Sequence, residues 1–151
     1  MKHINKASLR KITIADQKYL WKVGHYHLES FKHAKCVEKV VIYLKDYKKA
    51  PLQLLFREED NLCTSTDIKK QKWCVGYPET GVIWLSKPRD DEKPQTENID
   101  INLNRPAIIR KLIEYYISNG WCPKEQNKPF LIENALLILE EKKFLIEIAS
   151  L

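Results

Sequence analysis

The N-terminal part of the chain shows two short runs in which apolar and polar residues alternate. They span Leu9–Ile14 and Tyr19–Val23, and a short segment, Ala15–Lys18, separates them. A period of two is typical of a strand that buries one face, and two such runs around a short link indicate a β-hairpin. The pattern therefore predicts an antiparallel hairpin near the N-terminus.

Five further segments predict strands, because β-branched and aromatic residues are concentrated in them. They are Val37–Leu44, Leu52–Phe56, Trp73–Val75, Val82–Leu85 and Ile99–Leu103. Glycine and proline residues between the third and fourth of these segments are typical of the link in a longer hairpin. The first two thirds of the chain therefore predict an antiparallel sheet.

A helix is predicted over residues 105–119, because apolar residues recur there three and four positions apart. Asn104 is expected to cap the first turn through its side-chain oxygen, and Pro106 suits that turn because its missing N–H costs little. Asn119 and Gly120 tolerate the left-handed conformation that ends many helices. The predicted buried face comprises Ile109, Leu112, Ile113, Tyr116 and Ile117.

The remaining segments complete the predicted fold. Lys87–Asn98 has two prolines and charges of both signs, which predicts a mobile loop or a linker. Phe130–Ile132 favours a strand, whereas Asn134–Glu141 suits either a helix or a strand. A helix with one apolar face needs a surface to cover, so we expect a single α+β domain over residues 1–151, with the helix packed on an antiparallel sheet.

The composition is ordinary for a soluble protein. Of the 151 residues, 44% are hydrophobic and 30% are charged, which is enough for a core without disulfide bonds. No apolar run approaches the roughly 20 residues of a membrane helix, and the N-terminus lacks the apolar stretch of a signal peptide. The expected location is the cytoplasm, where free, partly buried thiols are expected at Cys36, Cys63, Cys74 and Cys122.

The net charge of +6 is distributed along the chain. The first 104 residues contain 19 lysines and arginines against 14 acids, and the remainder contains 7 against 6. Nucleic-acid-binding proteins usually concentrate basic charge on one face, whereas here acids are interleaved, as in Lys45–Lys49. This distribution favours a solvated surface.

One histidine-rich stretch is the candidate metal site. His25 and His27 are two positions apart and would share one face of a strand, and His33 and Cys36 follow. A structural zinc site needs four such ligands, and a catalytic site needs three and a water. The spacing matches none of the common zinc patterns, so no metal or other cofactor is expected.

Two charged segments are the candidate partner-binding surfaces. Lys69–Trp73 joins basic charge to an aromatic ring, as on surfaces that stack single-stranded nucleic acid, and Tyr43–Lys49 could extend it. The alternative is a lysine-rich loop leading into a strand that buries Trp73. The second segment is the predicted charged loop. The candidate contact residues are Lys69, Lys70, Lys72, Arg89, Asp90, Asp91 and Glu92.

The sequence lacks the common catalytic motifs. It contains no Walker A loop, no glycine-rich dinucleotide turn, no H-E-x-x-H and no G-x-S-x-G. Cys36 and His33 could form a nucleophile and base, but such a pair also needs a third group that orients the base. Runs of adjacent acids such as Glu58–Asp60 are usually solvated. The sequence therefore favours a non-enzymatic role.

Both ends of the chain carry a pattern that is similar to a known family. Residues 104–123 read NRPAIIRKLIEYYISNGWCP and are followed by KPF at 128–130, and residues 12–21 have the form I-x-I-x-D-x-x-Y-x-W. These segments resemble a family of small bacterial proteins with no established activity. The resemblance implies an α+β fold and assigns no catalytic residue.

We therefore expect a small bacterial protein-binding module, with an immunity protein that blocks a toxin as its specific form. Its partner would be another protein, because lysine-rich surfaces attract acidic partners, and no membrane contact is expected. A nucleic-acid-binding module using the lysine-rich segments is the first alternative. A metal-dependent enzyme at the histidine-rich stretch is the second.

Overall fold

The computed structural model describes residues 9–28, 35–57, 74–79, 81–88, 96–140, 144, 147, 148 and 151. Within these ranges the chain forms the α+β fold that the sequence predicts. The elements are β1 (Arg10–Ile14), β2 (Gln17–Leu28), β3 (Lys35–Leu44), β4 (Tyr47–Arg57), β5 (Cys74–Glu79), β6 (Val82–Pro88), β7 (Thr96–Asn102), α1 (Pro106–Ser118), β8 (Phe130–Ile132) and the 3-10 helix η3 (Ala135–Glu140).

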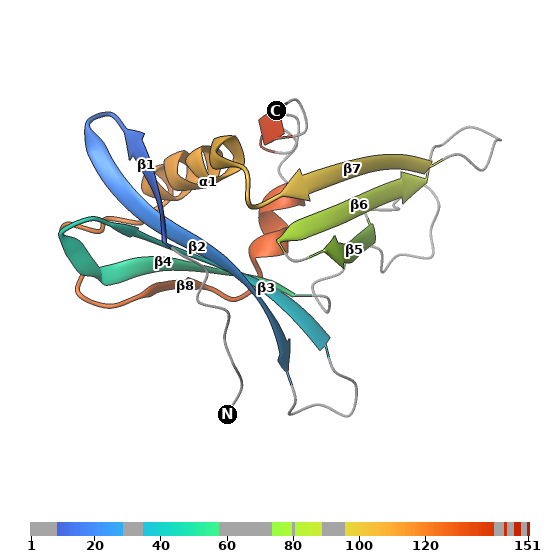
Figure 1. The fold of residues 1–151 in the computed structure, drawn as a ribbon, viewed down its shortest axis with the longest axis horizontal. Helices are drawn as coiled ribbons and strands as arrows, with labels where there is room; N and C mark the ends of the chain where they lie inside the picture. The colour runs from blue at the N-terminus through green and yellow to red at the C-terminus, as the bar shows by residue number, and fades with distance from the viewer. Residues whose placement is uncertain are drawn as a thin grey trace.

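The strands form two sheets (Figure 1). The larger sheet has the order β1-β2-β3-β4-β8, and the smaller sheet has the order β5-β6-β7. Neighbouring strands are antiparallel, except that β8 runs parallel to β4. In Figure 1, α1 and the smaller sheet lie on the same side of the larger sheet. The structure thus contains a second sheet that the predicted arrangement of one sheet and one helix did not include.

Tight turns connect β1 to β2 and β3 to β4 at one end of the larger sheet. Ala15 and Asp16 have positive φ angles of 48° and 64°, which is the conformation of a two-residue type I′ turn, whose twist matches the flanking strands. The N-terminal hairpin is therefore confirmed. Asp46, in the next hairpin, has a φ of 73°, a region that aspartate tolerates better than most residues.

The strand β4 begins at Tyr47, well before the predicted start at Leu52. Pro51 lies within β4, beside the register irregularity between Ile42 and Leu44 of β3. Proline has no backbone N–H to donate, so a strand tolerates it where the ladder is interrupted. The bulge thus allows β4 to continue through the proline.

One face of the larger sheet, which we call the inner face, forms the core with α1 and the smaller sheet. Every second residue of β2, β3 and β4 points into this core, as alternation along a strand requires. The inner-face members are Tyr19, Trp21, Val23, Val40, Ile42, Leu44, Leu52, Leu54 and Phe56, and the smaller sheet adds Ile83 and Ile101. The opposite face of the larger sheet is called the outer face below.

The helix α1 packs on the inner face and confirms the predicted helix. Its buried residues are Ile108, Ile109, Leu112, Ile113 and Tyr116. Ile117, which was predicted to be buried, is 43% exposed, and Ile108 is buried in its place. The prediction for Ile117 was wrong because the buried stripe turns toward Ile108, which packs beside the end of the smaller sheet.

The two ends of α1 differ from the prediction in one respect. Arg105, and not Asn104, occupies the N-cap position, and it makes no side-chain cap hydrogen bond. The backbone N–H of Asn104 instead donates to Oδ1 of Asn102 at 2.9 Å. At the other end, Gly120 has a φ of 107°, and the N–H of Trp121 donates to the carbonyl of Tyr116 at 2.8 Å. This Schellman geometry confirms the predicted C-terminal end.

The C-terminal elements follow the prediction, whereas two strands extend into the predicted charged loop. The strand predicted at Phe130–Ile132 is confirmed as β8, and most of the segment left open forms η3. The strands β6 and β7 reach Pro88 and Thr96, so they extend into the range predicted as a loop. Cys122 is a free thiol, as predicted, but it is exposed.

Within the described residues, every helix is too short or too polar to cross a membrane.

Candidate functional site

Glu38 is the one charged residue that is fully buried in the described part of the chain. It lies on the inner face in β3, directly opposite His25 of β2 and beside Phe56 of β4 in the register. A carboxylate without access to water is costly unless its oxygens are hydrogen-bonded or paired with a cation. The partners of Glu38 therefore decide what this residue does.

Both carboxylate oxygens of Glu38 have a partner. Oε1 pairs with Nδ1 of His25, and Oε2 accepts a hydrogen bond of 2.8 Å from the backbone N–H of Gly81. Gly81 lies in the turn that leads into β6, so the first contact is within the larger sheet and the second reaches the smaller sheet. The Glu38 carboxylate therefore joins the two sheets.

The position of Gly81 requires a glycine. Its φ is +80°, and a Cβ atom there would lie 2.4 Å from Nδ2 of Asn104, so a side chain would be strained and would clash. The Gly81 carbonyl also accepts a hydrogen bond of 2.7 Å from the N–H of Leu103. The Gly81 peptide groups thus contact both β3 and the segment that enters α1.

The arrangement around Glu38 favours a structural role. The side chain of His25 is 22% exposed and that of Glu38 is 0% exposed. A general acid or base must come within hydrogen-bond reach of its substrate, and the Glu38 oxygens are already used by His25 and Gly81. The site therefore stabilises the contact between the sheets.

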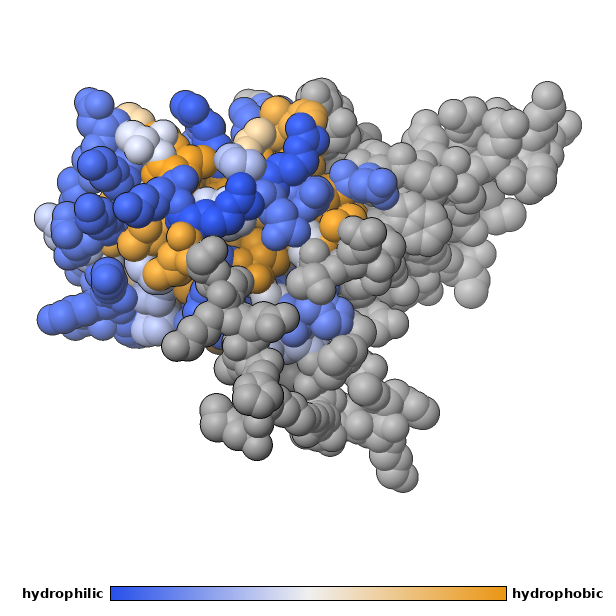
Figure 2. Space-filling model, viewed as in Figure 1, coloured by the Kyte–Doolittle hydropathy of each residue, from blue (hydrophilic) through white to orange (hydrophobic). Residues whose placement is uncertain are grey.

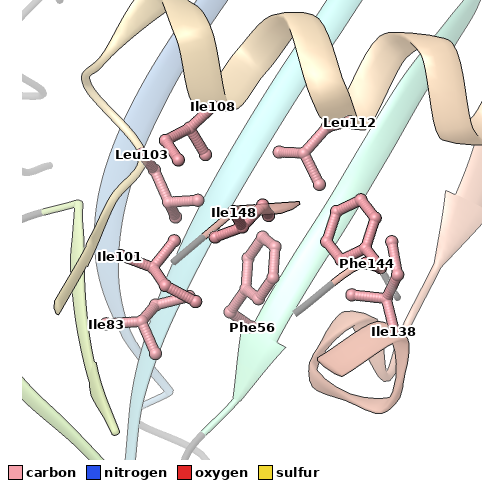
Figure 3. Close-up of a pocket in the computed structure, with 9 residues that line it drawn as sticks. All are labelled: Phe56, Ile83, Ile101, Leu103, Ile108, Leu112, Ile138, Phe144 and Ile148. Atoms are coloured by element: carbon pink, nitrogen blue, oxygen red, sulfur yellow. The ribbon is translucent and has the colours of Figure 1, made fainter. Parts of the chain in front are cut away.

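A small cavity lies inside the core between α1, the smaller sheet and the C-terminal residues (Figure 3). Its volume is about 10 Å³, about the space that a single water molecule needs. A water molecule also needs polar partners, which apolar walls do not supply. The cavity is therefore a packing gap and offers no substrate site. Its walls are Phe56, Ile83, Ile101, Leu103, Ile108, Leu112, Ile138, Phe144 and Ile148.

Tyr19 is the titratable residue that burial affects most clearly in the described part. It is 4% exposed, and its ring centroid lies 6.0 Å from that of Trp121. Burial disfavours the phenolate and raises the pKa of Tyr19 above its ordinary value of 10.0. The neutral phenol is therefore the form that the fold stabilises.

Folding stability is expected to fall above pH 10 partly because of Tyr19. The folded-state pKa lies above the unfolded value of 10.0, so the contribution of Tyr19 is complete below the unfolded pKa and is lost as the pH rises toward the folded one. Urea denaturation at pH 8 and pH 10.5 measures the loss. Tyr19→Phe cannot ionise and should lose less stability over this range; an equal loss in both proteins would contradict the expectation.

Within the described part, no helix or strand packs on the outer face of the larger sheet (Figure 1). Tyr26 is 39% exposed and Leu131 is 47% exposed. A Cβ atom at Gly24 would lie 2.8 Å from Cε2 of Tyr26, so the Tyr26 ring lies across the Gly24 backbone. Alternation along the strands also places six other apolar residues on this face. Leu20 and Val37 are buried, and Val41, Tyr43, Pro51 and Leu55 are partly buried.

The charges on the outer face are almost all positive. Glu38 is the single acid in the strands β1–β4, and it lies on the inner face. Glu133, next to β8, lies 3.9 Å from Arg57 and is 67% exposed. The basic residues on this face are Lys11, Lys18, Lys22, Lys39 and Arg57. The outer face thus combines apolar side chains with a basic margin.

The structure brings part of the metal candidate together. The register of β2 and β3 pairs His25 with Glu38 and His27 with Cys36, so the backbone places three of the four candidates at neighbouring positions on two strands. Among the described side chains, no group of three or more histidines, cysteines or acids has the arrangement of a metal site. His33 lies outside the described residues.

The predicted partner-binding residues lie outside the described residues: Lys69, Lys70, Lys72, Arg89, Asp90, Asp91 and Glu92. The described part of the basic surface is the β3–β4 hairpin, where Lys45, Lys48 and Lys49 are exposed on both sides of Asp46. Nζ of Lys124 lies 5.8 Å from the centre of the exposed Tyr47 ring.

Comparisons of the chain with protein-family models, with curated proteins and with solved structures find no match.

Proposed function

We propose that this protein acts by binding another protein, as an inhibitor of the immunity type that blocks a toxin by covering its active site. The observation that carries the proposal is the outer face, on which no described helix or strand packs and where Tyr26 and Leu131 are 39% and 47% exposed. Tyrosine is enriched at protein interfaces relative to the rest of a protein's surface.

The strands that carry this face also suit an inhibitor. Residues in β2, β3 and β4 are held by ladder hydrogen bonds to their neighbours, so the face is formed before a partner arrives. A preformed surface avoids the entropy cost of ordering a loop on binding, which favours tight association. A cytoplasmic location is part of the proposal, because an exposed free thiol such as Cys122 is compatible with a reducing compartment.

Affinity capture tests the proposal. Tagged protein is incubated with a nuclease-treated lysate of the native host at about 0.15 M salt, and bound proteins are identified by mass spectrometry. We expect one partner at a stoichiometric amount. A toxin-like protein would support the specific form. Material that is captured from an untreated lysate but is lost after nuclease treatment or at moderate salt would contradict protein binding and support the lysine-rich surface instead.

A metal site is the second candidate, and the register between β2 and β3 favours it. His27 is opposite Cys36 in the backbone register, and His25 lies two residues before His27 on β2, so residue types that zinc prefers occupy adjacent backbone positions. Elemental analysis of the purified protein tests this candidate. About one zinc per chain would support it, and absence of metal together with no spectral change on addition of Co²⁺ would exclude it.

A further inference from the structure

We infer that the outer face of the larger sheet docks a protein that presents acidic side chains around an apolar ridge. The inference rests on the proposed protein-binding function and specifies its surface and the chemistry of its partner. It combines the partly exposed Val41 and Leu55 of the outer face, the lysines beside them, and the lack of acids on this face in the strands β1–β4.

The register places apolar and basic residues side by side on this face. Val41 of β3 lies between Lys22 of β2 and Gln53 of β4, and Lys39 lies between Gly24 and Leu55. Every apolar residue in these two rows therefore has a lysine as its cross-strand neighbour. A partner that buries Val41 and Leu55 must also contact Lys22 and Lys39.

Lys22 and Lys39 lie close enough to repel one another. Lys22 is opposite Val41, and Lys39 is two residues from Val41 on the same strand, so the two lysines are diagonal neighbours with their Cα atoms about 7–8 Å apart. The strands around them contribute no acid to this face. An acidic side chain on the partner would relieve this repulsion, which makes charge complementarity specific for an acidic surface.

The spacing of the tyrosines favours a protein over single-stranded nucleic acid. Tyr26 is opposite Val37, and Tyr43 lies six residues beyond Val37 on β3, which is about 20 Å along the strand. Stacking surfaces for nucleic acid place aromatic rings under successive bases. Here aliphatic side chains lie between the two rings, as in the centre of a protein interface.

Hydrophobic surface gathers near the middle of the described part, whereas the end that holds the two tight turns is hydrophilic (Figure 2). Asp16 and Asp46 lie in those turns, so the hydrophilic end carries both signs of charge. The outer face differs because its strands have only basic charge.

The test compares two variants with the same net charge. Lys22→Glu with Lys39→Glu reverses both charges on the outer face, and Lys124→Glu with Lys128→Glu reverses two exposed lysines between α1 and β8. The host lysate, treated with nuclease, is the probe for the wild type and both variants. Thermal melting checks that each variant folds, and the captured protein is then purified and titrated calorimetrically.

We expect the outer-face variant to raise the Kd at least about tenfold, with the 124/128 variant within about twofold of the wild type. The captured protein should have a cluster of acids at its contact surface. Equal binding by both variants would overturn the outer-face assignment while leaving the protein-binding function intact. Capture of no protein by the wild type would overturn the proposed function itself. Material that the wild type captures from an untreated lysate but not from the nuclease-treated one would assign the face to nucleic acid and overturn the inference.

Discussion

Replacing Glu38 by alanine is expected to lower the free energy of unfolding by about 3–5 kcal/mol. The Glu38→Ala change removes the acceptor of the buried Gly81 N–H and the partner of His25. An unsatisfied buried donor costs the full desolvation of that group. Since domains of this size are stable by about 5–15 kcal/mol, the variant should be close to unfolding. Urea denaturation followed by circular dichroism measures the effect.

Glu38→Gln is the matched control. Its amide oxygen can still accept from Gly81, and its amide group can still form a hydrogen bond with the His25 ring, so most of the contacts between the sheets are kept. We expect a loss of about 1–2 kcal/mol. In hydrogen exchange, the Gly81 amide should lose protection in the alanine variant and keep it in the glutamine variant. Equal stability of the two variants would contradict the joining role of Glu38.

Trp121→Ala is expected to lower the free energy of unfolding by a similar amount, about 3–5 kcal/mol. Trp121 is 0% exposed, and its ring lies 6.0 Å from that of Tyr19. Its Nε1 donates a hydrogen bond of 2.9 Å to the carbonyl of Ala50 in β4. The alanine variant would lose the packed ring and leave that carbonyl without its donor. Thermal and urea denaturation would measure the loss.

A comparison of the buried Trp21 and Trp121 separates the contribution of the hydrogen bond to stability from that of packing. Trp21 is 1% exposed, and its Nε1 has no hydrogen-bond partner among the described residues. Trp121→Phe should therefore cost about 1 kcal/mol more than Trp21→Phe, because only the first removes a hydrogen bond. The guanidinium of Arg10 lies 4.4 Å from the Trp21 ring and can stack on phenylalanine as well. An equal or larger loss of stability in Trp21→Phe would show that packing alone determines the effect of both substitutions.

The local parts of the fold were predictable because each follows from a short pattern. Alternation identifies β1 and β2, and the three- and four-residue spacing identifies α1. The Gly120 end was predictable because glycine reaches positive φ without strain. The N-terminal cap was not, because Asn102 accepts hydrogen bonds from the N–H groups of Asn104 and Arg105. These bonds place Asn104 in a turn before the helix, and the turn depends on how β7 ends.

The long-range parts of the fold were not predictable from patterns. Separation of the strands into two sheets, and the parallel pairing of β8 with β4, depend on which strands meet in space. The three residues of β8 show no alternation that specifies a partner. Strand pairing between distant segments carries no local signal, whereas hairpins do.

Glu38 was the part of the site that the sequence could have indicated. It occupies the alternating position shared by Val40, Ile42 and Leu44 in β3, so alternation alone places an acid on a buried face. Its partner Gly81 could not be inferred, because the hydrogen bond spans 43 positions in the sequence. The outer face was hidden for a similar reason, since its basic residues come from four strands.

Lysine footprinting of the complex tests the central claim, that the outer face binds a protein partner, most directly. The chain is acetylated alone and with its captured partner, and the modification of each lysine is measured by mass spectrometry. We predict that Lys22 and Lys39 become protected in the complex while Lys124 and Lys128 do not. Protection of Lys124 and Lys128 with unchanged labelling of Lys22 and Lys39 would contradict the account.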